Sequence, residues 1–212
     1  ELGIAERTII IFTSDNGGTE QYVVPLRGGK GTLHEGGLRV PACIAGPGIA
    51  PKQSTAEPMS SIDVYPTLLE LAGAAPKQAH PIDGVSLLPL LEGKTETLDR
   101  KGLFWHFPCY IGKGRPSSAM REGHLKLIEF FEDNHVELYD LAADPGERRD
   151  LARSRPDLAA KLHAQLKRLQ GELKAPRPTQ VNPNYDPAAT RPRGRKPRGG
   201  GKRAEKRQGA RS

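Results

Sequence analysis

Hydrophobic residues near the start of the chain form a run without polar interruption. Residues 7–13 read Arg-Thr-Ile-Ile-Ile-Phe-Thr, and this β-branched run lacks the alternation of a half-buried strand. The pattern predicts a strand buried on both faces, which is typical of a parallel sheet in an α/β fold. A second short strand is predicted at 40–45, ended by Gly-Pro-Gly. The glycine-rich stretch at 25–37 has no clear period and is predicted to be a loop.

Helical spacing occurs at two places farther along the chain. One helix is predicted at residues 63–73, with Asp63 as its cap and Gly73 just past its end. Its apolar stripe consists of Val64, Leu68 and Leu71. A longer amphipathic helix is predicted at 155–173, with a stripe formed by Leu158, Leu162, Leu166 and Leu169. Between the two helices, short strand candidates separated by turns predict a small antiparallel sheet from residues 103–107, 118–121, 125–130 and 136–140.

Charge divides the chain into a nearly neutral part and a basic tail. The whole chain carries +7, whereas residues 189–212 alone hold ten Lys or Arg and one acid. We therefore predict an α/β portion at 1–100, an antiparallel subdomain with a helix at 101–174, and a disordered basic tail at 175–212. The basic run at 191–198 has no interleaved aromatic residue, and no folded nucleic-acid module accompanies it. Nucleic acid is therefore not the expected partner, and attraction to an anionic polysaccharide or envelope is as plausible. The favoured interpretation is a solvated extension without a function of its own.

Three further observations bound the class of protein. No run approaches the ~18 apolar residues of a membrane span, so none is predicted. The chain begins at Glu1 and enters an apolar run at once, which indicates a piece of a longer protein, so the absence of a signal peptide says nothing about export. Cys43 and Cys109 are the only cysteines, and we interpret them as small buried hydrophobes.

Two short segments carry candidate chemistry. Asp15 and Asn16 follow the first predicted strand, and their carboxylate and amide oxygens are hard ligands suited to Ca²⁺ or Mg²⁺. The alternative is an ordinary Asp-Asn-Gly turn. Lys30 lies between glycines that allow close backbone approach, so its ammonium could bind an oxyanion. The alternative is a solvated loop lysine, because the segment does not match a phosphate-binding loop.

The motifs gain meaning from their order. Ser-Asp-Asn-Gly at 14–17 is followed by Gly-Lys-Gly-Thr at 29–32 and Glu-Gly-Gly-Leu-Arg-Val-Pro at 35–41. Further segments follow at 60–68, 83–87, 121–127 and 137–147. Over roughly residues 5–170 the chain resembles the C-terminal portion of the sulfatase family, in particular bacterial arylsulfatase and N-acetylgalactosamine-6-sulfatase-like members. The resemblance implies part of an alkaline-phosphatase-like α/β core plus a small C-terminal antiparallel sheet packed with a helix.

The same resemblance implies a mechanism and roles for individual residues. Sulfatases use a formylglycine nucleophile beside a Ca²⁺ ion, with Mg²⁺ as the alternative. Asp15 and Asn16 would complete the metal shell, and Lys30 would contact the sulfate ester and serve catalysis. His106 is a candidate for the substrate pocket, or else a packed strand histidine. The family's Cys/Ser-x-Pro-x-Arg motif is absent from these 212 residues, so we expect the nucleophile in a missing N-terminal portion and no turnover by this chain alone.

Other interpretations remain open on sequence alone. Glu35 and Arg39 could form a buried ion pair that holds the glycine-rich loop, and His34 is expected to be a packing residue. The resemblance implies a small-molecule or polysaccharide sulfate ester as substrate and a periplasmic or extracellular location. A phosphatase or phosphonate hydrolase of the same superfamily is the alternative enzyme. The alternative outside catalysis is a binding module, or a protein that acts through its basic tail.

Overall fold

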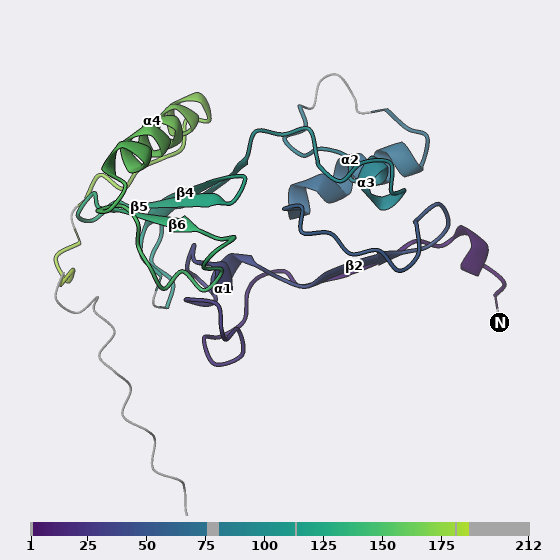
Figure 1. The fold of residues 1–212 in the computed structure, drawn as a ribbon, viewed down its shortest axis with the longest axis horizontal. Coiled ribbons are helices and arrows are strands. Elements are labelled where there is room, and N and C mark those ends of the chain that lie inside the picture. The colour runs from purple at the N-terminus through teal and green to yellow at the C-terminus, as the bar shows by residue number, and fades with distance from the viewer. Residues whose placement is uncertain (1, 76–80, 113, 181, 187–212) are drawn as a thin grey trace, which may run out of the picture. The chain divides into compact units, whose positions relative to one another are not determined.

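The computed structural model describes residues 2–75, 81–112, 114–180 and 182–186. Residues 1–181 form one compact unit, and residues 182–212 form a second unit, of which only 182–186 are described. The first unit contains a strand pair, a group of short helices, and a four-stranded sheet with a long helix (Figure 1). Most of the predicted basic tail lies outside the described residues. In the described part of the chain, no helix combines the length and apolar character that crossing a membrane requires.

The four-stranded sheet is an antiparallel meander, as the sequence predicted. Its strands lie in the order of the chain and are β3 Leu103–Phe107, β4 Ser117–Glu122, β5 Leu125–Phe130 and β6 Val136–Asp140. Helix α4, Pro156–Glu172, covers one face of this sheet (Figure 1). The interface buries Met120, Leu127 and Leu138 of the sheet against Ala159, Leu162 and Leu166 of the helix. The predicted stripe is thus largely confirmed, because side chains three and four residues apart share a helix face.

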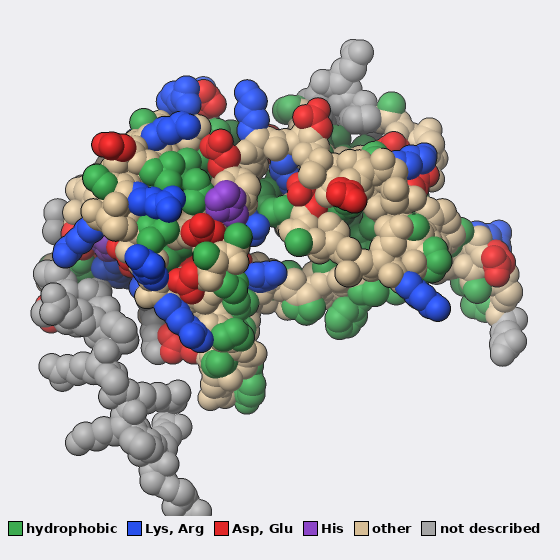
Figure 2. All heavy atoms as spheres, in the orientation of Figure 1, with side chains coloured by type: hydrophobic (Ala, Val, Ile, Leu, Met, Phe, Trp, Pro, Cys, Tyr) green, Lys and Arg blue, Asp and Glu red, His purple; other side chains and the backbone are tan. Residues whose placement is uncertain are grey.

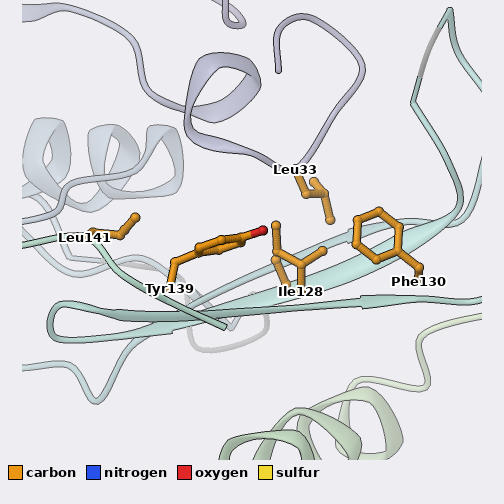
Figure 3. Close-up of a cluster of buried hydrophobic side chains, with 6 residues drawn as sticks. Leu33, Ile128, Phe130, Tyr139 and Leu141 are labelled. Carbon is orange, nitrogen blue, oxygen red and sulfur yellow. The ribbon is translucent and has the colours of Figure 1, made fainter. Parts of the chain in front are cut away.

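The opposite face of the sheet packs against the glycine-rich loop. Figure 3 shows Leu33 of that loop above Ile128 and Phe130 of β5, with Tyr139 and Leu141 beside them. The loop contains a one-turn helix, α1 Glu35–Leu38, where the sequence predicted no element. Paired glycines disfavour a helix on propensity alone, so the tertiary contacts must impose this turn.

The first strand pair departs from the prediction. Strand β1, Ile10–Thr13, pairs with β2, Ala42–Ala45, in an antiparallel ribbon. Ile10 and Phe12 are 64% and 67% exposed, so the prediction of a strand buried on both faces of a parallel sheet is wrong for this structure. The physical reason is that β2 is its only partner strand among the described residues, and a two-stranded ribbon cannot bury its faces without a covering layer. Figure 2 shows hydrophobic side chains open to solvent along this region.

The cysteines also depart from their interpretation. Cys43 lies in β2 opposite Phe12, and Cys109 follows β3; both are free and exposed. The interpretation of both cysteines as small buried hydrophobic residues is therefore wrong. Neither sits beneath a second layer that would bury it.

The helical region between the two sheets is organised around one buried aspartate. Asp63 is fully buried and ends the short 3₁₀ turn η2, Ser61–Asp63, that leads into α2, Val64–Leu71. Its carboxylate accepts hydrogen bonds from the backbone of Ser60 at 2.7 Å and of Val85 at 3.1 Å. Arg100 pairs with both carboxylate oxygens, at 2.9 and 2.8 Å. The predicted helix is confirmed with Asp63 at its N-cap position, but the Asp63 side chain makes no capping hydrogen bond to α2. A third core cluster forms beside the helix from Leu87, Leu90 and Leu98, next to α3, Leu88–Leu91.

Short segments extend the folded unit at both of its ends, beyond β1 and α4. A short 3₁₀ turn, η1 Ala5–Arg7, precedes β1. After α4, the backbone carbonyl of Pro176 and the guanidinium of Arg177 still contact the sheet. Packing therefore extends two residues beyond 175, where the tail was predicted to begin.

Candidate functional site

The candidate metal ligands and the candidate sulfate-binding lysine lie on two segments joined through their backbones. Asp15 and Asn16 follow β1 directly, in a bend, as predicted. The next residue, Gly17, donates its N–H to the carbonyl of Gly37 at 3.0 Å. The N–H of Lys30 donates to the carbonyl of Gly18 at 2.8 Å. The structure therefore brings the Asp-Asn bend and the lysine loop together.

Glycine is required where these segments meet, because the backbones approach more closely than a side chain allows. A Cβ on Gly17 would lie 2.0 Å from the carbonyl oxygen of Gly36. A Cβ on Gly29 would lie 2.8 Å from the carbonyl oxygen of Gly18. The glycines that the sequence offered as a route for ligand approach thus serve first to let two chain segments touch.

The candidate side chains at this junction are accessible. Asp15 and Lys30 are exposed, and Asn16 is partly exposed. The hydroxyl of Ser14 donates to the backbone carbonyl of Asn16 at 2.9 Å, which fixes the bend without using the two candidate ligand side chains. An accessible ammonium is a point charge available to an oxyanion.

The donor chemistry of the bend suits a hard cation, but it is incomplete. Asp15 and Asn16 supply oxygen atoms, whereas Ca²⁺ takes about six to eight oxygen ligands. Over the described ranges, no group of three or more His, Cys, Asp or Glu residues could hold a metal ion. The residues present therefore fit part of a metal shell, and the metal assignment stays a prediction.

A buried ion cluster fastens the glycine-rich loop to the sheet. The Nζ atom of Lys126 in β5 lies 2.9 Å from Oε1 of Glu35 in α1 and 2.9 Å from Oε1 of Glu147. The backbone N–H of Glu35 also donates to Oε2 of Glu147, at 2.7 Å. All three residues are at most 4% exposed. The cluster fixes the start of α1, and through it the Gly36–Gly37 backbone on which the Asp-Asn bend rests.

Sequence reasoning identified only part of this cluster. Arg39 does approach Glu35, but at 3.9 Å and with 57% of its side chain exposed, so the predicted pair is not buried on the arginine side. The buried partner of Glu35 is Lys126, which the sequence analysis missed. The available signal was strand alternation, because Lys126 shares a face of β5 with Ile128 and Phe130.

A second cluster links the same loop to β6. Oε2 of Glu137 accepts a hydrogen bond from the Tyr139 hydroxyl at 2.8 Å and lies 2.9 Å from Nε2 of His34. Arg27 pairs with Oε1 of Glu137 at 3.2 Å and donates to the Tyr139 hydroxyl. Burial acts to raise the pKa of Glu137, but hydrogen bonds from His135 and His34 and the charge of Arg27 outweigh it and hold that pKa well below its usual range. His34 is thus buried, as expected for a packing residue, and is also hydrogen-bonded.

His106 lies on β3, where both ring nitrogens have partners within the protein. Nδ1 is 2.6 Å from the hydroxyl of Ser118, and Nε2 is 2.8 Å from the backbone carbonyl of Pro176. A carbonyl only accepts, so Nε2 donates to Pro176, and in the neutral imidazole Nδ1 then accepts from the serine hydroxyl. A substrate contact through either nitrogen would require one of these bonds to open. The substrate role of His106 therefore stays a prediction that this geometry does not favour.

Comparison with known proteins places this fold in a class. Residues 29–172 match the family described as "N-sulphoglucosamine sulphohydrolase, C-terminal". A protein named "Sulfatase" from Formosa agariphila is 40% identical over 184 residues, which are 78% of this chain and 33% of that protein. The fold is thus that of a C-terminal sulfatase domain. The chain belongs to the sulfatase family, as its motifs indicated.

Solved structures agree with this assignment of the fold. The structure of BT4656 in complex with its substrate D-glucosamine-2-N,6-O-disulfate has a TM-score of 0.65 at 28% identity, covering 81% of this chain and 36% of that one. The phosphonate monoester hydrolase of Agrobacterium radiobacter has a TM-score of 0.63 at 27% identity, covering 80% and 36%. The predicted α/β sulfatase fold is therefore confirmed, and the chain spans about a third of the length of these relatives.

Proposed function

We propose that this chain contributes the C-terminal part of the catalytic site of a sulfuric ester hydrolase. The observation that supports this proposal is the junction between the Asp15–Asn16 bend and the Lys30 loop, which is held by two backbone hydrogen bonds. That junction presents oxygen ligands and a cation from two segments of one compact unit. A sulfate ester needs this pairing, because its sulfuryl oxygens are anionic and its leaving oxygen gains charge as the bond to sulfur breaks.

Each residue has a defined part in the proposal. Asp15 and Asn16 would hold a Ca²⁺ ion, or Mg²⁺, together with ligands from outside the described residues. When bound, such an ion supplies Lewis-acid polarisation of the sulfuryl oxygens. Lys30 neutralises charge on the sulfuryl group and orients the ester. The nucleophile, a formylglycine in this proposal, would come from a portion of the protein that precedes residue 1, so this chain alone would not turn over.

The exposed strand pair supports a role for such a preceding portion. Ile10 and Phe12 present large apolar side chains to solvent on β1. Burying these two side chains beneath further chain would stabilise the protein by about 1.5–3 kcal/mol for each side chain. The substrate would be a sulfate ester of a small molecule or a polysaccharide, in line with the sugar disulfate on which BT4656 acts. A periplasmic or extracellular location follows from this proposal.

Two experiments test the proposed function. The coding sequence upstream of residue 1 should encode Cys/Ser-x-Pro-x-Arg in frame; a stop codon or an unrelated domain there would favour the binding module. In the protein expressed from that complete reading frame, Lys30→Ala should lower kcat/KM for 4-nitrophenyl sulfate by about 10²–10³-fold, as loss of one charge-stabilising donor does. Lys161→Ala, at an exposed position of α4, is the matched control. If the Lys30→Ala variant keeps its activity, Lys30 has no role in catalysis.

A phosphonate or phosphate ester hydrolase is the second candidate. This candidate is supported by the structural similarity to a phosphonate monoester hydrolase. The two candidates separate when 4-nitrophenyl sulfate and 4-nitrophenyl phenylphosphonate are compared as substrates of the same preparation. Higher kcat/KM for the sulfate supports the first proposal, and the reverse order supports the second.

A further inference from the structure

A segment of the antiparallel subdomain lies directly against the lysine loop. This segment, residues 109–112 with Gly114, connects β3 to β4. A Cβ on Gly31, whose φ is +87°, would lie 2.8 Å from the carbonyl oxygen of Ile111. A Cβ on Gly114 would lie 1.7 Å from the carbonyl oxygen of Gly31. Gly31 follows Lys30 in the chain, so this segment packs against the residue next to the candidate sulfate-binding lysine.

The segment is held in shape by its own contacts. The N–H of Gly114 donates to the carbonyl of Ile111 at 2.8 Å and closes a tight turn. The Tyr110 hydroxyl donates to Oε1 of Glu132 at 2.7 Å. Arg115 pairs with the other oxygen of Glu132 at 3.4 Å and stacks over Phe130, with 4.3 Å from its guanidinium carbon to the ring centre. The tyrosine ring is thus fixed at its polar end.

The same segment leaves its apolar surface open. Tyr110 is 49% exposed and Ile111 is 51% exposed. Ile111 lies against the lysine loop, with its Cγ2 atom 3.4 Å from where a Cβ on Gly31 would sit, and Tyr110 precedes it in the chain. Together they offer an aromatic ring and a branched aliphatic chain. Immobilising the ring before a ligand arrives lowers the entropy cost of binding.

We infer that Tyr110 and Ile111 form the wall of the substrate site that contacts the ring of the ester's alcohol part. This inference rests on the proposed function, because it takes Lys30 as the residue at the sulfate. A sulfate bound at Lys30 leaves the alcohol part to extend across the adjacent segment. Aryl and sugar rings share flat or C–H-bearing faces that pack on an aromatic side chain. The wall therefore selects ring-bearing sulfate esters over short-chain alkyl sulfates.

Steady-state kinetics on the protein from the complete reading frame test this wall. The substrates are 4-nitrophenyl sulfate, glucose 6-sulfate and ethyl sulfate, which offer an aryl ring, a sugar ring and no ring. Tyr110→Ala should raise KM for the ring-bearing esters about three- to tenfold while kcat changes less than about twofold. For ethyl sulfate, kcat/KM should stay within about twofold of wild type. Tyr110→Phe keeps the ring but loses its hydrogen bond to Glu132, so it should raise KM for the ring-bearing esters by less than Tyr110→Ala does.

Two further variants separate ring contact from loss of loop structure. Tyr110→Leu keeps apolar bulk without a ring and should resemble Tyr110→Ala in KM while retaining the wild-type unfolding temperature. Tyr65→Ala removes a tyrosine that is 58% exposed on α2 and should change neither kcat nor KM for any of the three esters.

The outcomes distinguish this inference from the function on which it rests. A rise in KM for only one ring-bearing ester supports the wall and identifies the ring as aryl or sugar. Equal loss on all three substrates, or no change on any, overturns the wall while the sulfatase proposal stands. A wild-type protein that hydrolyses none of the three esters overturns the proposed function, and the wall with it.

Discussion

The ammonium of Lys126 lies 2.9 Å from a carboxylate oxygen of Glu35, and both residues are almost fully buried. Lys126 also pairs with buried Glu147, so one cation holds two carboxylates between the sheet and the glycine-rich loop. Removing one member of such a cluster strongly destabilises the fold, because the charges that remain are buried without a partner.

Lys126→Met should therefore lower the free energy of unfolding by about 3–5 kcal/mol. Urea denaturation followed by tryptophan fluorescence measures this change. Lys161→Met, on the exposed side of α4, is the matched control and should change it by less than about 0.5 kcal/mol. A loss below about 1 kcal/mol in Lys126→Met would mean that the cluster does not anchor the loop.

Gly17→Ala should disturb the junction between the Asp-Asn bend and the α1 backbone. The added Cβ would lie 2.0 Å from the Gly36 carbonyl oxygen, so a backbone must shift at a cost of about 1–3 kcal/mol. We expect a lower unfolding temperature. In the complete protein we also expect slower turnover of a sulfate ester. Gly171→Ala in α4 meets no atom within 4 Å and should stabilise by about 0.5–1 kcal/mol. Equal effects of the two substitutions would contradict the close contact.

Stability at low pH should depend on Glu129. Burial acts to raise its pKa, but hydrogen bonds from Lys167, Arg177 and Gln170 outweigh it and lower the pKa to about 2. Because the folded-state pKa is depressed, ionised Glu129 stabilises the fold above the usual carboxyl pKa, and this contribution is lost as pH falls from about 4.5 toward 2. Its size is about 3 kcal/mol, because one pKa unit corresponds to about 1.4 kcal/mol.

Glu129→Gln should therefore remove part of the acid dependence. The difference in unfolding free energy between wild type and variant, measured from pH 7 to pH 2, should shrink as pH falls. Glu137 also has a depressed pKa, so the variant keeps some acid sensitivity. A difference that is constant over this range would contradict the proposed stabilisation of the ionised form.

His106 should act mainly on stability. Its ring joins Ser118 of β4 to the Pro176 carbonyl, so His106→Ala removes two hydrogen bonds of about 1 kcal/mol each. We expect a lower unfolding temperature with KM for 4-nitrophenyl sulfate unchanged in the complete protein. An increase in KM without loss of stability would instead support the substrate role inferred from the sequence.

The antiparallel subdomain could be predicted closely from the sequence because its signals are local. Alternation and turns fix the four strands within one or two residues, and helical spacing fixes α4. Asp63 and Gly73 marked the ends of α2 for the same reason, and Gly73 indeed adopts a φ of +64° after the helix. These features depend on residues within a few positions of one another.

Features that depend on distant partners could not be predicted in the same way. Lys126 and Glu35 are separated by 91 positions, and nothing local reveals that β5 faces α1. The strand at 10–13 has the sequence of a buried strand, yet its burial depends on a covering layer that the described residues do not supply. The Asp15–Asn16 bend was predicted at its strand end, but its contact with the lysine loop rests on glycine approaches visible only in three dimensions.

The glycine contacts at positions 17, 29 and 36 also bear on how such a site diversifies. Where two backbones touch, any added side chain must displace one of them, so mutational drift cannot gradually reshape the junction between the Asp-Asn bend and the lysine loop. The neighbouring segment around Tyr110 and Ile111 has exposed side chains that can be exchanged without moving a backbone. Under the proposed function, new preferences for the alcohol part should therefore evolve from this segment, while the backbone junction that carries Asp15, Asn16 and Lys30 is inherited unchanged.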